Sequence, residues 1–394
     1  MGLRNRVSGR VREGYAILQP RVTPSLPEGH QSTLLQRIFA SASGIDAYSA
    51  AVSDLYQDMF GEGSYAGKGI YEIDAFEAAL AQRVPESTLL SHDLFEGIFA
   101  RAGLATDVEV VEEFPTDYLV AAQRLHRWTR GDWQLLPWVL SSLVGAKTPE
   151  RERLSGIARW KMLDNLRRTL CTPLSLLTLV AGWCLPLHAA VIWTCFVLLA
   201  IAVPAFLPVV PDLVPRREWI TLRSYLSVVG AASAEAAVMT FLNIAFLAHQ
   251  AFLMADAILR TLVRVFLTRR HMLQWVPAAQ IAGLMRSGVW GYYGRMLPAP
   301  LLAAAITLGV SAADASWNLV LVAPMAILWC FSPAVAMWAS RTPVLAARSR
   351  PSRTDIRTLR MTARRTWRFF ETFTTQSDHM LPPDNFQEDP SPVV

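Results

Sequence analysis

Acidic residues are scarce in the second half of this 394-residue sequence. Only five lie between Cys171 and Ser340, where long apolar runs fill most of the interval, whereas residues 1–170 have ordinary charge density. This shortage excludes an ordinary soluble domain, because only a bilayer tolerates such a long stretch with so little charge. We therefore expect a soluble part in residues 1–150 and a membrane part in residues 151–340. The five acids are Asp212, Glu218, Glu235, Asp256 and Asp314.

Cysteine is also rare, and no pair has Cys-x-x-Cys spacing. The four cysteines all lie in the apolar region, which argues against both a disulfide framework and a zinc site. Residues 1–18 lack the continuous apolar run of a signal peptide. We therefore expect residues 1–170 to start in the cytoplasm. The cysteines are Cys171, Cys184, Cys195 and Cys330.

The formal net charge of +5 comes largely from arginines that lie beside the apolar runs. Nine of them fall between Arg341 and Arg368, and further ones precede and follow residues 226–259. Positive charge at the ends of membrane spans is typical of their cytoplasmic flanks. Because no RNA- or DNA-binding motif accompanies this charge, we expect no nucleic acid partner.

Residues 15–140 alternate between strand-like and helix-like patterns, which fits the end of an α/β domain. We expect strands at Tyr15–Val22, where Pro20 ends the strand, and at Val108–Val111, and helices at Ser32–Phe60, Asp74–Gln82 and Tyr118–Leu140.

The membrane part holds four apolar runs of suitable length for helical spans. A fifth run, Leu226–Leu259, contains ionisable residues and has arginines near both ends, so both ends favour the cytoplasm. We favour four full spans, with this fifth run lying in the interface or re-entering, over a true fifth span. The four runs are Pro173–His188, Ala189–Pro208, Leu297–Ala313 and Leu319–Ala339.

Residues 341–394 read as a basic juxtamembrane linker and the start of a truncated C-terminal domain. The segment Thr362–Glu371 is amphipathic, so it can either lie on a bilayer or begin another domain. The Pro-rich segment Leu381–Pro390 has no closing element, and we expect the chain to be interrupted there.

Two features of the soluble part could contact a substrate. The segment Gly61–Gly69 has four glycines in nine residues and predicts a loop, which either admits an acceptor sugar or is a plain surface turn. Asp93 follows Ser91 and His92 at the start of an apolar run, where a carboxylate could accept a proton from a sugar hydroxyl. Taken alone, Ser91 and Asp93 before an apolar run are better explained as ordinary helix-capping residues.

A third feature is a cluster of arginines and tryptophans. Guanidinium groups match phosphate oxygens and indole rings provide flat faces for sugars, so the cluster predicts a diphosphate and acceptor site. The alternative is a juxtamembrane helix with interfacial arginine and tryptophan. The cluster contains Arg124, Arg127, Trp128, Arg130, Asp132 and Trp133.

These motifs resemble, in their order, the second half of processive family 2-type glycosyltransferases. In their amino-acid sequences these segments resemble cyclic β-1,2-glucan synthases more closely still, and the resemblance covers nearly the whole chain. The segments that carry it are Tyr56–Tyr71, Leu89–Gly97, His126–Gln134 and Leu381–Glu388. The resemblance implies an internal fragment: the C-terminal, α/β part of a GT-A-like domain followed by an α-helical transmembrane bundle in a bacterial inner membrane.

The resemblance also assigns roles. It implies that Asp93 is the general base, that Arg127 and Trp128 hold the diphosphate and the acceptor, and that Gly67 and Lys68 lie in the acceptor loop. The implied reaction transfers glucose from UDP-glucose to a growing β-1,2-glucan. Ser91 and His92 replace the Thr-Glu of the wider pattern, and Arg124 replaces its Gln.

The nucleotide-binding strands and the Asp-x-Asp motif of such enzymes are absent from these 394 residues. Mg²⁺ or Mn²⁺ is implied for a complete enzyme, but no metal ligand is found in this sequence. Two alternatives stay open: a non-catalytic membrane subunit that pairs with a separately encoded N-terminal half, and a membrane transporter. A transporter would have no use for Asp93 and the arginine–tryptophan cluster.

Overall fold

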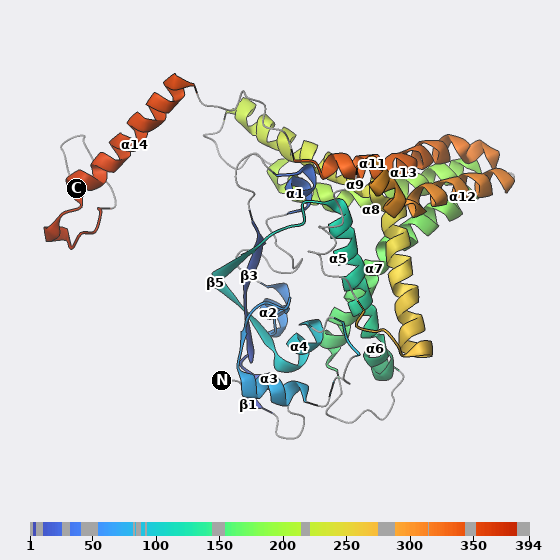
Figure 1. The fold of residues 1–394 in the computed structure, drawn as a ribbon, viewed down its shortest axis with the longest axis horizontal. Helices are drawn as coiled ribbons and strands as arrows, with labels where there is room; N and C mark the ends of the chain where they lie inside the picture. The colour runs from blue at the N-terminus through green and yellow to red at the C-terminus, as the bar shows by residue number, and fades with distance from the viewer. Residues whose placement is uncertain are drawn as a thin grey trace. The chain divides into compact units, whose positions relative to one another are not determined.

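The computed structural model describes residues 3–4, 11–25, 32–40, 54–81, 83, 88–90, 93–143, 154–213, 221–274, 288–313, 315–342 and 352–383. The chain divides into two compact units, Met1–Thr342 and Pro343–Val394. The described residues are mostly helical, and a three-stranded sheet lies along one edge of the N-terminal part, with helices beside it (Figure 1).

The three-stranded sheet has the order β4-β3-β5. Strand β3 (Ile17–Pro24) pairs antiparallel with β4 (Ile70–Tyr71) and parallel with β5 (Ala102–Glu112). A separate pair, β1 (Leu3–Arg4) and β2 (Val11–Glu13), is antiparallel.

Pro20 does not end the first strand as predicted. Pro20 pairs with Ala105 but Arg21 pairs with Glu109, so β5 makes an irregularity of three extra residues at this point. Proline has no N–H to donate, and a bulge in the partner strand is a usual way to accommodate that loss. The second predicted strand, Val108–Val111, is only the end of an eleven-residue strand.

In the described part of the chain, four short helices lie between the strands of this sheet, and two further helices follow its last strand. The predicted long helix Ser32–Phe60 is wrong in extent, because α1 already ends at Phe39 and α2 starts anew at Leu55; residues 41–53 lie outside the described residues. Thr33 and Gln36 form a reciprocal capping box that begins α1. These helices are α1 (Leu34–Phe39), α2 (Leu55–Phe60), α3 (Ile73–Leu80), α4 (Asp93–Ala100), α5 (Tyr118–Gln134) and α6 (Leu136–Leu143).

The core of the soluble part lies between the sheet and helices α4, α6 and α7 (Gly156–Trp183) (Figure 1). Phe95 and Phe99 of α4 are buried, with ring centroids 4.7 Å apart, and Trp138 meets Phe95 edge-on at 5.3 Å. Burying such a side chain contributes about 2–3 kcal/mol. This packing fixes α4, and with it Asp93 at its first position.

The membrane part contains three described helices that are long and apolar enough to cross a bilayer, and a fourth if the pair α11–α12, bent by 57°, counts as one span. By length and composition, these helices fit a multi-pass membrane protein. The elements are α8 (Leu187–Phe206) with η3 (Leu207–Leu213), α9 (Leu222–Leu262) with the π-helical η4 (Val263–Thr268), α11 (Val289–Met296), α12 (Pro298–Ala312), η5 (Ser316–Asn318) and α13 (Leu319–Ala339).

Helix α7 and helix α9 differ from expectation. The apolar run Pro173–His188 is not a helix of its own, because α7 begins at Gly156 with a charged half and ends at Trp183. The run Leu226–Leu259 lies within one continuous 41-residue helix, which leaves no break for a re-entrant loop, whereas a position in the interface stays a prediction. Arg216 and Arg217, which weighed in that expectation, lie outside the described residues.

The second unit contains helix α14 (Arg353–Phe373) and the short helix η7 (Gln376–Asp378). Ser352 and Asp355 form a capping box that begins α14. This helix includes the predicted amphipathic segment Thr362–Glu371.

Candidate functional site

The glycine-rich segment is a loop that the surrounding elements hold in place. Asp54 caps α2 through Oδ1, which accepts from the backbone N of Tyr56 and Gln57 at 2.9 and 3.0 Å. The other carboxylate oxygen, Oδ2, accepts from Ser64 N at 3.1 Å. Lys161 Nζ, on α7, donates to the carbonyls of Glu62 and Gly63 at 3.2 and 2.9 Å. The loop is therefore attached both to its own helix and to the helix that leads toward the membrane.

The loop passes directly in front of Asp93. Gly67 has φ +79°, and a Cβ on this residue would lie 2.8 Å from Asp93 Oδ1. A side chain at this position would displace the Asp93 carboxylate or the loop, and the positive φ independently favours glycine. The predicted acceptor loop and the predicted general base are thus neighbours. Ser91 and His92 lie outside the described residues.

Tyr65 anchors the same loop on α4. A Cβ at Gly97, one turn after Asp93, would lie 2.7 Å from Tyr65 Cβ, so the glycine makes room for the tyrosine. Burial, together with the negative charges of Glu96 and Asp93, raises the pKa of Tyr65 to about 12. The phenol therefore stays protonated beside the carboxylates at neutral pH.

A carboxylate connects the loop to the arginine–tryptophan helix. Glu112, at the end of β5, lies with Oε2 3.0 Å from Lys68 Nζ and with Oε1 3.5 Å from Arg124 Nη2. The Arg124 guanidinium in turn stacks over the Trp128 ring at 4.4 Å from its centroid. The residues from the glycine loop to Trp128 therefore form one continuous set of contacts.

Arg124 and Arg127 lie close enough for their charges to interact. Burial lowers the pKa of Arg124, Glu112 acts in the opposite direction, and the charge of Arg127 lowers this pKa further. Two neighbouring guanidinium groups form a site that favours an anion. Both belong to α5, whose first turn Asp117 caps by accepting from Leu119 N at 2.7 Å.

The other three predicted site residues make contacts within the fold. Arg130 donates to the carbonyls of Gln274 and Met272 at 2.7 and 3.1 Å. Asp132 accepts from Asn165 Nδ2 at 3.0 Å, and burial raises the pKa of this carboxyl group to about 6. Trp133 Nε1 donates to Thr169 Oγ1 at 2.9 Å. These contacts attach α5 to α7 and to the segment that follows η4.

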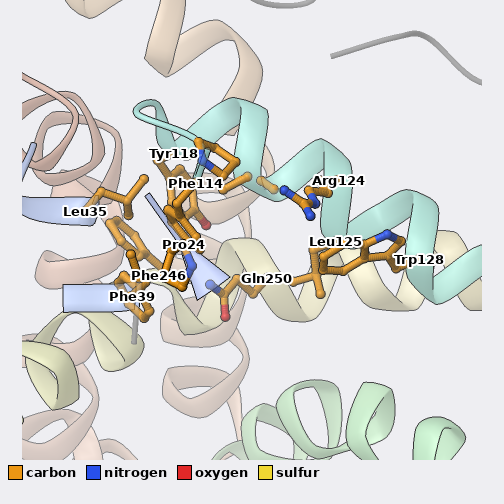
Figure 2. A pocket seen from close by; sticks show the side chains of 14 residues that line it. Pro24, Leu35, Phe39, Phe114, Tyr118, Arg124, Leu125, Trp128, Phe246 and Gln250 are labelled. Atoms are coloured by element: carbon orange, nitrogen blue, oxygen red, sulfur yellow. The ribbon is translucent and has the colours of Figure 1, made fainter. Parts of the chain in front are cut away.

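A pocket of about 340 Å³ lies between α5 and α9, beside Trp128 (Figure 2). Its wall is mostly apolar. Arg124 and Trp128 lie at one end, and the phenylalanines Phe39, Phe114 and Phe246 lie at the other (Figure 2). The lining residues labelled in Figure 2 are Pro24, Leu35, Phe39, Phe114, Tyr118, Arg124, Leu125, Trp128, Phe246 and Gln250.

Sequence reasoning missed four residues that position this site. Gln19 of β3 accepts a hydrogen bond from Ala66 N of the loop through Oε1. Gln134 accepts from Leu90 N at 2.7 Å, which holds the chain just before Asp93. The others, Glu112 and Lys161, are described above. Two of the four had a sequence signal: Glu112 begins the acidic pair Glu112-Glu113 after the second predicted strand, and Gln134 ends the segment His126–Gln134 that carries the resemblance.

Among the described residues, no group of three or more His, Cys, Asp or Glu side chains could hold a metal ion. The described residues therefore offer no site for the Mg²⁺ or Mn²⁺ that the resemblance implies for a complete enzyme.

No family model matches this chain. The chain is 44% identical over 382 residues to the cyclic β-(1,2)-glucan synthase NdvB of Rhizobium meliloti (strain 1021), a match that covers 97% of this chain and 13% of that protein. The chain thus spans about an eighth of the length of this relative. The expected family resemblance is confirmed: over nearly its whole length, this chain is homologous to a segment of a cyclic β-1,2-glucan synthase.

Proposed function

We propose that this chain forms the acceptor side of a GT-A-like membrane glucosyltransferase, which transfers glucose from UDP-glucose to a growing β-1,2-glucan at an inner membrane. The observation that carries the proposal is the continuous set of contacts from Asp93 through the glycine loop and Glu112 to Arg124 and Trp128. The similarity to a cyclic β-(1,2)-glucan synthase supports the substrate class.

In the proposed reaction, an acceptor hydroxyl attacks the anomeric carbon of the donor glucose. Asp93 accepts the hydroxyl proton, the new C–O bond forms with inversion, and UDP leaves with the electrons of the old bond. Arg124 and Arg127 stabilise the negative charge that develops on the diphosphate. Trp128 offers a ring face to the sugar, and Gly67 lets the loop approach the base.

The cation of a complete enzyme would need ligands other than the described residues, so no step of this proposal depends on one. The donor's nucleotide site is likewise assigned to a separate nucleotide-binding segment. We therefore expect transfer only when such a segment is present.

The test is incorporation of radiolabelled glucose from UDP-glucose into glucan by membranes that contain the chain, alone and together with the nucleotide-binding segment of a glucan synthase. The variant Asp93→Asn keeps the size of the side chain but removes the base, so we expect at least about a 100-fold loss of incorporation. The matched control is Asp74→Asn, which removes another acid from the first turn of a short helix, α3. Equal rates for the two variants would refute the assignment of Asp93.

A further inference from the structure

Helix α14 separates its apolar side chains from its cationic ones. Apolar residues recur at intervals of three or four, which places them on one face of a helix, and the arginines lie together on the polar side beside it. Nothing in α14 is buried, and Leu359 and Trp367 are 63% and 59% exposed. The apolar face consists of Ile356, Leu359, Ala363, Trp367, Phe370 and Phe373.

The polar face is strongly cationic. Six arginines and two acids lie between Arg353 and Phe373, which gives a net charge of +4. Both acids are engaged within the helix: Asp355 caps the first turn with Ser352, and Glu371 Oε1 lies 2.9 Å from Arg364 Nη1. The charge that α14 offers to a partner is therefore positive.

Covalent connection keeps α14 near the bilayer. The apolar helix α13 ends at Ala339, and thirteen residues separate it from Arg353. Thirteen fully extended residues reach at most about 45 Å. A tether of this length makes lipid binding an intramolecular event with a high effective concentration.

We propose that α14 lies in the interface of an anionic bilayer. Its apolar face enters the acyl boundary, with Trp367 and Phe370 at interfacial depth, and its arginines contact lipid phosphates. A protein partner is the other possible occupant of such a face. The arginine-rich polar face favours lipid, because anionic headgroups complement it along its whole length whereas a protein groove would cover only the apolar side.

The experiment places a nitroxide spin label on either face of α14 in the whole chain, with the four native cysteines replaced by serine. Ala363→Cys reports on the apolar face, and Met361→Cys, two residues away, reports on the arginine side. The chain is reconstituted in nanodiscs with and without phosphatidylglycerol. Collision rates with oxygen, which partitions into lipid, and with a water-soluble nickel chelate are measured for both labels.

In anionic nanodiscs we expect the label at 363 to collide at least about threefold more with oxygen relative to nickel than the label at 361. This contrast should fall in neutral nanodiscs, and in the triple variant Arg357→Gln, Arg360→Gln, Arg364→Gln. The proposal is overturned if the label at 363 is as accessible to nickel as the label at 361. It is also overturned if 363 is shielded from both reagents in either lipid, since that result would indicate a protein partner.

Discussion

Gly67 and Asp93 lie in direct contact although 26 positions separate them in the sequence, and a Cβ on the glycine would come within 2.8 Å of the aspartate Oδ1. The contact places a flexible loop against the carboxylate that we propose as the base. Replacing Gly67 with alanine, which adds a single carbon, therefore tests this contact.

We predict that Gly67→Ala abolishes transfer at a moderate cost in stability. Alanine at φ +79° costs roughly 1–2 kcal/mol, and its Cβ would displace either the loop or the Asp93 carboxylate. The matched control is Gly61→Ala, which has a similar backbone angle, φ +69°, but whose Cβ would meet only the flexible end of Arg101 at 3.2 Å. Similar melting temperatures with loss of UDP-glucose incorporation only in Gly67→Ala would support the contact. Equal activity of the two variants would contradict it.

We predict that Glu112→Gln weakens acceptor use while leaving the fold intact. The substitution removes the charge that holds Lys68 and Arg124, and partly exposed ion pairs contribute less than about 1 kcal/mol to stability. We expect about a tenfold rise in the KM for the glucan acceptor, which corresponds to about 1.4 kcal/mol of lost positioning. Glu113→Gln, at the exposed neighbouring position, is the control.

A double-mutant cycle measures whether Lys68 and Glu112 act together. If Glu112 acts by holding the loop, then Lys68→Met should add little to the effect of Glu112→Gln. Fully additive effects of the two substitutions on KM would show that the residues act independently.

The sequence contained the local features of this site but not its assembly. The helical prediction for Tyr118–Leu140 depended only on residues near one another in the sequence. Helices α5 and α6 cover that range. The contact of Gly67 with Asp93 depends on where α4 packs, and Lys68 meets Glu112 only because β5 pairs with β3. Both arrangements rest on pairings between residues far apart in sequence, which no local pattern encodes.

Buried polar groups were equally out of reach of sequence reasoning. The sequence predicted Asp132 as a substrate residue from its place in the motif, whereas in the structure it accepts from Asn165. Its role in substrate binding stays a prediction, and its ionisation offers a test.

We predict that Asp132 lowers stability as the pH rises. Its pKa is raised from 3.8 to about 6, so the folded state favours the protonated form. The stability that this preference contributes is full below pH ~4 and is lost as the pH rises through about 6. Because solvent reaches part of the Asp132 side chain, the loss amounts to about 1–2 kcal/mol.

Asp132→Asn keeps the size of the side chain and removes the titration. Thermal unfolding of the purified chain should therefore show a smaller decline between about pH 4 and 7 in this variant than in the wild type. Identical pH profiles would contradict the raised pKa. Unchanged glucose incorporation by Asp132→Asn would show that Asp132 has a structural role and does not bind substrate.

Two sets of contacts define the ends of the membrane bundle. At the end near the soluble part, Tyr118 N donates to Ser340 Oγ at 2.9 Å, just after α13. At the far end, Asn318 Nδ2, just before α13, donates to the carbonyls of Trp183 and Leu185 at 2.6 and 2.8 Å. The turn between α7 and α8 therefore lies at the far end, and α8 returns toward the soluble part.

Helix α9 then begins and ends on the side of the soluble part. It follows α8, and its second half lies along α5, where His126 Nε2 is 2.9 Å from Asp256 Oδ2 and Tyr118 Oη is 2.9 Å from His249 Nδ1. A single continuous helix that starts and finishes on one side of a bilayer does not cross it. We therefore predict that α9 lies along the interface, even though it is long and apolar enough to span.

Cysteine accessibility tests this topology in the chain whose four native cysteines are replaced by serine. Single cysteines are placed at Ser316, at the far end of the bundle, and at Ser224 and Thr268, near the two ends of the α9–η4 helix; all three positions are exposed. A membrane-impermeant maleimide added to intact spheroplasts should label Ser316→Cys, whereas Ser224→Cys and Thr268→Cys should react only after permeabilisation. Labelling of Ser224→Cys in intact spheroplasts would instead place the start of α9 outside and make the helix a true span, since its other end is held against α5.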